Sequence, residues 1–228
     1  GAWDVTGGTF NLGSASNFIT NVAITGDLLF PVSSARVRIA GTTTFPRARF
    51  QSSSTSIGFA PGSVFNGEII NESTSSAYVE MNGTNGTFTL GPSGVIRSTS
   101  TGTVNVGGGF WFGGEMNFVN LGTISDDVGA AALTTAHVNL NAATISNRGL
   151  IRATNGGVVT IGAANGTFVN EAAVVAPPQP AGTITVGDGS RASLLGNWDN
   201  NGTLTVGGTL NSVPARLTFE GVNDSADL

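Results

Sequence analysis

Apolar and polar residues alternate at every second position in short stretches of this chain. The hexapeptide Gly-[Thr/Val]-apolar-[Thr/Asn]-apolar-Gly occurs six times, at Gly8–Gly13, Gly86–Gly91, Gly102–Gly107, Gly157–Gly162, Gly182–Gly187 and Gly202–Gly207. Side chains two apart lie on the same face of an extended strand, so each copy turns its apolar pair one way and its Thr or Asn the other. Glycine permits a bend at both ends. The pattern predicts short strands separated by tight turns.

A second pattern places an apolar residue, Asn, often Gly and another apolar residue at alternate positions. Its clear copies begin at Phe118, Ile145, Phe168 and Trp198, and looser copies begin at Val64 and Leu90. These first residues are 26, 28, 27, 23 and 30 residues apart. Repeats of this length made of short strands are typical of a solenoid, in which stacked coils share one core.

We therefore expect an all-β chain that folds as a single-domain parallel β-helix (β-solenoid) of about nine coils. Residues 1–60 are the least regular and are expected to form N-terminal coils or a cap, residues 61–208 the regular coils, and residues 209–228 a C-terminal coil or cap. Asparagines at equivalent corners are expected to bond to one another from coil to coil, as in stacked cross-β structure. The residues expected in this corner ladder are Asn66, Asn120, Asn147, Asn170 and Asn200.

Composition narrows the classes of function. Only 10% of residues are charged, 34 are glycine, the formal net charge is −5 and all nine basic residues are arginine, so nucleic acid is not an expected partner. Cysteine is absent, which excludes disulfides and thiolate chemistry. No apolar run approaches the roughly 18 residues of a membrane-spanning segment. The start at Gly1-Ala2 without Met suggests a processed export product or an excised fragment, and we expect an extracellular or cell-surface location.

The phrases Phe118-Val-Asn-Leu-Gly-Thr-Ile124 and Trp198-Asp-Asn-Asn-Gly-Thr-Leu-Thr-Val206 resemble the coil repeats of bacterial β-helical surface proteins. The families concerned are autotransporter passenger domains and filamentous-haemagglutinin-like adhesins. The resemblance covers about Val64 to Val206 and is one of repeat style. It implies a right-handed parallel β-helix, export, and a role as stalk, adhesin or fibre.

No constellation of catalytic residues stands out, and we expect no enzyme activity, no cofactor and no metal. The adjacent carboxylates Asp126 and Asp127 follow the strand expected to end at Ile124 and could share a site only in a loop, because adjacent residues of a strand point to opposite faces. His137 is the only histidine, which excludes a multi-His metal site. An alternative is a polysaccharide-binding or polysaccharide-cleaving β-helix. For that alternative the aromatic run Phe110, Trp111 and Phe112 offers either a sugar platform or ordinary core packing.

A third alternative is an ice-binding protein that uses Thr-x-Thr ladders. The threonines concerned are Thr87, Thr89, Thr183, Thr185, Thr203 and Thr205, which are expected on the solvent face of their strands. The competing interpretation is that Thr is the polar residue with the best β propensity.

Charge differs between the two ends of the chain. Residues 1–60 carry four Arg against two Asp, whereas residues 199–228 carry one Arg against four acidic residues. A solenoid end with unpaired backbone groups can template pairing with another chain, and complementary ends favour head-to-tail association. The residues expected at such assembly ends are Arg36, Arg38, Arg47, Arg49, Glu220, Asp224 and Asp227. The sequence thus favours a non-catalytic structural or adhesive solenoid whose partner is a second copy or a cell-surface or matrix glycan.

Overall fold

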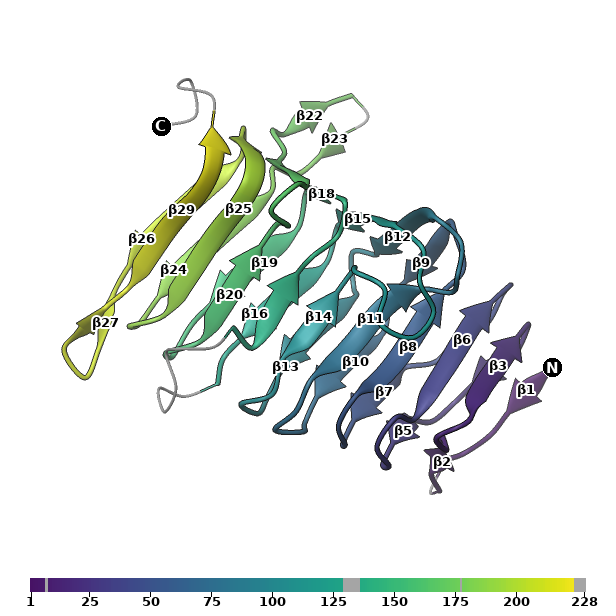
Figure 1. The fold of residues 1–228 in the computed structure, drawn as a ribbon. Helices are drawn as coiled ribbons and strands as arrows, with labels where there is room; N and C mark the ends of the chain where they lie inside the picture. Colours follow the sequence, from purple (N-terminus) through teal and green to yellow (C-terminus); the bar gives the residue numbers. More distant parts are fainter. Residues whose placement is uncertain (7, 129–135, 177, 224–228) are drawn as a thin grey trace.

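The chain folds into stacked β-strands, most of them parallel (Figure 1). A computed structural model describes residues 1–6, 8–128, 136–176 and 178–223, and in these residues it contains strands and no helix. The strands follow one another along an elongated stack from β1 to β29 (Figure 1). The all-β parallel architecture expected from the alternation is therefore present, and it is consistent with a β-solenoid.

Three rows of strands run along the stack, and the chain visits them in a fixed order. Row I is a nine-strand parallel sheet. Its strands are β2 (Phe10–Asn11), β5 (Leu28–Phe30), β7 (Arg47–Phe50), β10 (Glu68–Asn71), β13 (Val95–Ser98), β16 (Thr123–Asp126), β19 (Leu150–Ala153), β24 (Thr183–Gly187) and β26 (Thr203–Gly207).

Rows II and III belong to one larger sheet, because the long strand β25 (Arg191–Asn200) joins them. Row II contains β3 (Ser16–Thr20), β6 (Arg36–Ala40), β8 (Thr55–Phe59), β11 (Ala77–Met81), β14 (Val104–Val106), β17 (Val138–Leu140), β20 (Val158–Ile161) and the first half of β25. Row III contains β9 (Ser63–Phe65), β12 (Gly86–Leu90), β15 (Met116–Asn120), β18 (Thr144–Asn147), β21 (Thr167–Asn170) and the second half of β25. The last strand, β29 (Arg216–Asn223), pairs along β25.

Three short pairs complete the fold. Strand β1 (Ala2–Trp3) pairs in parallel with β4 (Ala23–Ile24) at the N-terminal end. Two antiparallel hairpins, β22 (Val174–Val175) with β23 (Pro178–Gln179) and β27 (Thr209–Leu210) with β28 (Val213–Pro214), interrupt the rows. We call one passage of the chain through rows I, II and III a layer.

The length of a layer varies along the stack. Inward-facing residues of row I stand side by side at Leu28, Ala48, Ile69, Ile96, Ile124, Ile151, Ile184 and Leu204. Successive members are therefore 20, 21, 27, 28, 27, 33 and 20 residues apart. The longest layer contains the hairpin β22–β23, whose prolines cannot continue a parallel ladder.

The register of the Asn-containing runs agrees with the sequence only in part. Phe118, Ile145, Phe168 and Trp198 stand side by side in row III as their spacing predicted. The alignment of Leu90 with Phe118 was wrong, because Phe88 pairs with Phe118 and Leu90 pairs with Asn120. Phe88 and Leu90 both face inward, so alternation alone cannot choose between them.

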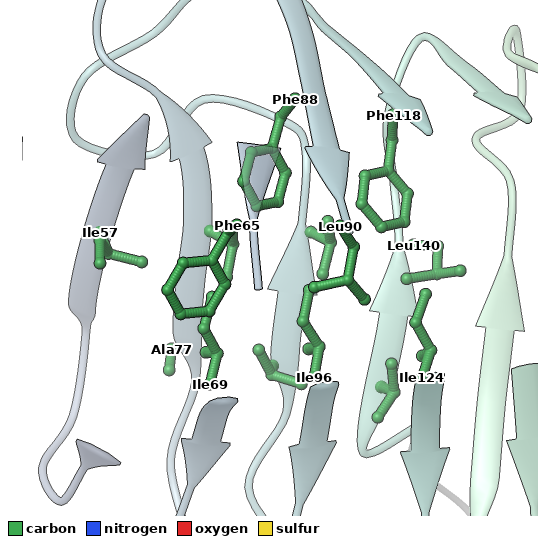
Figure 2. Close-up of a cluster of buried hydrophobic side chains, with 14 of the residues drawn as sticks. Ile57, Phe65, Ile69, Ala77, Phe88, Leu90, Ile96, Phe118, Ile124 and Leu140 are labelled. Carbon is green, nitrogen blue, oxygen red and sulfur yellow. The ribbon is translucent and has the colours of Figure 1, made fainter. Parts of the chain in front are cut away.

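The interior is a continuous column of apolar side chains. Phe59 stacks on Phe88 with ring centroids 4.4 Å apart, and Phe88 stacks on Phe118 at 5.9 Å. Aliphatic residues of row I, such as Ile96 and Ile124, lie beside this aromatic stack (Figure 2). All five residues are no more than 2% exposed. Each layer is thus stabilised mainly by the apolar area that it buries against its neighbours.

Glycine at the corner between rows III and I has a steric cause. Gly149 lies directly over Gly122, and a Cβ at Gly149 would stand 2.2 Å from the Gly122 carbonyl oxygen. The two layers approach too closely at this corner for any side chain. This close approach explains why Asn-x-Gly recurs with the repeat, since Asn120 and Asn147 each stand two residues before one of these glycines.

Candidate functional site

Four asparagines form a row of hydrogen bonds inside the corner between rows III and I. Asn120 Nδ2 donates to Asn147 Oδ1, Asn147 Nδ2 to Asn170 Oδ1, and Asn170 Nδ2 to Asn200 Oδ1, each at 2.7 Å. Asn120, Asn147 and Asn170 are fully buried. Asn66 lies outside this row. Its Oδ1 accepts a hydrogen bond from Ser93 Oγ, and the strand pairing places Phe65, the residue before Asn66, beside Leu90.

A second buried polar corner, between rows I and II, was not apparent from the sequence. It contains Asn71, Ser98 and Asp126, which stand side by side at the ends of β10, β13 and β16. The Asp126 carboxylate accepts hydrogen bonds from the backbone N–H of Val128 and Val158, and its Oδ2 lies 2.8 Å from His137 Nδ1. Because three different residue types occupy equivalent positions, the sequence contains no repeated residue that would predict this corner. In the described structure, these side chains form hydrogen bonds with backbone groups of the turns that follow their strands.

The six threonines of the ice-binding alternative occupy two different rows. In row I, Thr183 stands beside Thr203 and Thr185 beside Thr205, which makes a block two strands wide. The next strand of row I presents Leu150 and Arg152 at the same positions. Thr87 and Thr89 belong to row III, where their neighbours are Asn117 and Val119. The six hydroxyls therefore do not form one continuous ladder.

The four N-terminal arginines lie on the sides of the stack, not on its first strands. Arg47 and Arg49 are on β7 in row I and pair with Glu68 and Glu72 at 3.0 and 2.7 Å. The hydrogen bond to Glu72 raises the pKa of Arg49 above its ordinary value. Arg36 and Arg38 are on β6 in row II and lie over aromatic rings. The expectation that these four arginines lie at an end of the stack was wrong, because they contact carboxylates and aromatic rings on the sides of the stack.

The C-terminal end of the stack exposes apolar positions that are buried in the preceding strand of each row. Val206 stands directly beside Val186, which is 1% exposed, but Val206 is 43% exposed. Phe219 is 42% exposed although its ring stacks on buried Trp198 with centroids 4.8 Å apart. Glu220 lies on this last strand, whereas Asp224 and Asp227 lie outside the described residues. In the described residues, the inward-facing positions of β26 and β29 are therefore apolar and partly exposed, and each of these strands has an open edge.

The loop over residues 107–115 folds back across row II. The Glu80 carboxylate, on β11, is 1% exposed and accepts backbone hydrogen bonds from Phe110, Trp111 and Phe112 at 2.7, 2.9 and 3.1 Å. Ser56 Oγ donates to the same carboxylate. Consecutive amides that converge on one anion form a nest. Gly107, Gly108, Gly113 and Gly114 have φ between +69° and +88°, a backbone conformation that other residues rarely adopt.

This loop holds three aromatic side chains in defined positions. Phe110 lies parallel to Tyr78 with centroids 4.1 Å apart, and Trp111 Nε1 donates to the Ser54 carbonyl at 2.7 Å. Arg36 covers the Trp111 ring at 4.3 Å. A Cβ at Gly58 would stand 2.5 Å from the Phe112 ring, so glycine there allows the loop to approach the strand. The sequence showed the aromatic run but not where it lies, because Glu80 is 30 residues away from Phe110.

Within the part of the chain that the structure describes, no three His, Asp or Glu side chains gather where they could hold a metal ion. Nor is any helix there long and apolar enough to cross a membrane. In comparisons with known protein families, curated proteins and solved structures, nothing matches this chain. Function must therefore be argued from the surfaces described above.

Proposed function

We propose that this chain is a non-catalytic structural and adhesive module of an exported surface protein. In this proposal residues 1–228 form one right-handed parallel β-helix of about nine coils, with N-terminal coils up to residue 60 and a C-terminal coil from residue 209. The fixed order of rows I, II and III along the chain supports a helical winding. Right-handedness is favoured because crossovers between parallel strands of one sheet are almost always right-handed.

The observation that carries the proposal is the exposure of apolar, inward-facing residues on β26 and β29, the last strands that the structure describes. Val206 and Phe219 continue core positions that are buried one layer earlier. Open strand edges beside exposed core residues favour the addition of further strands. A second copy that places its β2 beside β26 and its β3 beside β29 continues rows I and II in parallel. Such a contact is heterologous, so it generates an open-ended fibre and not a closed dimer.

The contact in this proposal is formed by apolar area and backbone hydrogen bonds. Charge pairs between the two copies are not expected to dominate the free energy of association, because Arg47 and Arg49 are already paired with Glu68 and Glu72 on the side of the stack. Screening by salt weakens exposed charge pairs but not apolar burial. We therefore expect association to persist at high ionic strength.

A glutamate at Val206 is expected to abolish this association and leave the fold intact. The substitution Val206→Glu puts a charge where the proposal places a buried contact. An unpaired buried charge is expected to make the free energy of association less favourable by about 3 kcal/mol or more. Light scattering after size exclusion over a range of concentrations, with negative-stain microscopy, measures the outcome. Val64→Glu is the control, because Val64 is 61% exposed on the side of row III.

The wild-type chain and Val64→Glu should form rods that lengthen with concentration, and Val206→Glu should stay monomeric. A wild-type chain that is monomeric at every concentration contradicts the head-to-tail proposal. Protease accessibility of the protein on intact source cells tests the surface location separately.

A further inference from the structure

The aromatic loop presents rigid apolar rings to solvent. Phe110 is 51% exposed and Trp111 is 38% exposed, and their rings meet edge to face with centroids 5.2 Å apart. Tyr78 supports Phe110 from beneath. The Glu80 nest fixes the backbone of Phe110 and Trp111. Exposed apolar surface that is held in place in this way is typical of a binding site, because less conformational entropy is lost when a ligand binds to it.

A polar groove leads away from these rings along row II. One outward-facing side chain per strand lies in register along it, in the order Tyr78, Asn105, Asn139, Thr160, Ser193 and Thr218. Two hollows of about 340 and 220 Å³ follow this line, and both are lined by Ala136 and Thr160. At about 4.8 Å per strand, the line from Tyr78 to Thr218 is about 24 Å long. The groove therefore suits an extended ligand.

The chemistry of the groove restricts what it can hold. Around Asn105, Asn139 and Thr160 the groove offers amide and hydroxyl groups without charge, as in the bond from Asn139 Nδ2 to Asn105 Oδ1 at 3.2 Å. The smaller hollow at its far end is also lined by Arg191 and Arg216. Each inner strand of row II pairs with a strand on both sides, so no backbone edge is free to take up a peptide strand. The net charge of −5 disfavours nucleic acid. A ligand here must be held by side chains alone.

We propose that row II binds an extended neutral polysaccharide. A pyranose ring has a rim of hydroxyls and an apolar C–H face, which packs against the parts of the Phe110 and Trp111 rings that Tyr78 and Arg36 leave exposed. The sugars that follow bond through their hydroxyls to Asn105, Asn139 and Thr160. Aromatic platforms of this kind combine a large apolar contact with a few polar groups that set orientation. The rings and the three polar residues that bind the sugars lie on the loop over residues 107–115 and on β14, β17 and β20, so the site does not depend on the end contact proposed at β26 and β29.

Native gel electrophoresis through gels that contain a soluble polymer tests this site. The probes are hydroxyethylcellulose and soluble xylan, which are neutral, and polygalacturonate, which is acidic. We expect at least one neutral polymer to retard the wild-type chain, and Trp111→Ala to weaken that binding about tenfold or more. Trp3→Ala is the matched control, because Trp3 is exposed to a similar extent, 39%, but lies on β1 at the N-terminal end.

Three outcomes overturn the inference. The first is no retardation of the wild-type chain by any of the polymers. The second is retardation that Trp111→Ala leaves unchanged. The third is retardation by polygalacturonate alone, which assigns the surface to an acidic ligand. Phe110→Ala with an unchanged thermal midpoint provides a second variant, so that misfolding of one variant cannot imitate a loss of binding.

Discussion

Replacement of Glu80 by alanine is expected to lower the free energy of unfolding by about 3 kcal/mol and to release the loop over residues 107–115. The Glu80 carboxylate is the common acceptor for the backbone N–H groups of Phe110, Trp111 and Phe112. Without this carboxylate there are two alternatives. Either the three N–H groups stay in place and lack an acceptor, or the loop detaches from row II. The first alternative costs about 1–3 kcal/mol for each donor that remains buried. The second exposes Phe112, which is 9% exposed in the folded chain.

Urea unfolding measures the stability change, and chymotrypsin reports the loop, since its preferred aromatic residues Phe110 and Trp111 lie there. Glu115→Ala is the control, because Glu115 is an exposed carboxylate at the end of the same loop. Faster cleavage at Phe110 and Trp111 in Glu80→Ala alone is the expected result. Equal stability and equal cleavage of the two variants would show that the nest does not hold the loop.

Replacement of Asn147 by alanine is expected to cost about 2–4 kcal/mol, because it interrupts the buried asparagine row. Asn147 accepts a bond from Asn120 and donates one to Asn170, both at 2.7 Å, and all three side chains are fully buried. The truncation takes the 2.7 Å acceptor from Asn120 Nδ2, which keeps only its 3.4 Å bond to the Leu150 carbonyl, and it takes the side-chain donor from Asn170 Oδ1, in a place that water does not reach. Each carries a desolvation penalty that no new contact offsets.

Asn139→Ala provides a close comparison. Asn139 also donates to another asparagine, Asn105, across neighbouring strands, but it lies on the outer surface of row II and is partly exposed. Water can replace its bond, so its loss should cost less than about 1 kcal/mol. Thermal and urea unfolding of the two variants give the difference. If they are equally stable, the interior asparagine row does not stabilise the stack.

The sequence predicted the strands better than the rows to which they belong. The six hexapeptides are all strands, but they are distributed over three rows: β2, β24 and β26 in row I, β14 and β20 in row II, and β12 in row III. The alternation of apolar and polar residues determines which side chains face inward. Because strands of all three rows share this alternation, it does not indicate the row to which a strand belongs. For this reason the threonines at Thr87 and Thr183, which look equivalent in the sequence, lie in different rows.

The asparagine row was predictable for a different reason. Asn120, Asn147, Asn170 and Asn200 recur with their neighbours at nearly constant spacing, so the residue type and the register agree. At Asn66 the surrounding pattern is looser, and the strand pairing of Phe65 with Leu90 brings Gly91, not an asparagine, beside it. The polar corner of Asn71, Ser98 and Asp126 was missed because three residue types serve one position.

The sequence by itself determined that this chain forms short, glycine-bounded strands with one apolar face, since alternation and turn chemistry act between residues that are close along the chain. Only the tertiary structure decided which loop covers which strand, which arginines are engaged on the sides of the stack, and which core positions stay exposed at its end. Those outcomes depend on contacts between residues 20 or more positions apart, such as Glu80 with Phe110 and Arg49 with Glu72. Layer lengths of 20 to 33 residues set these contacts, and no local pattern fixes those lengths.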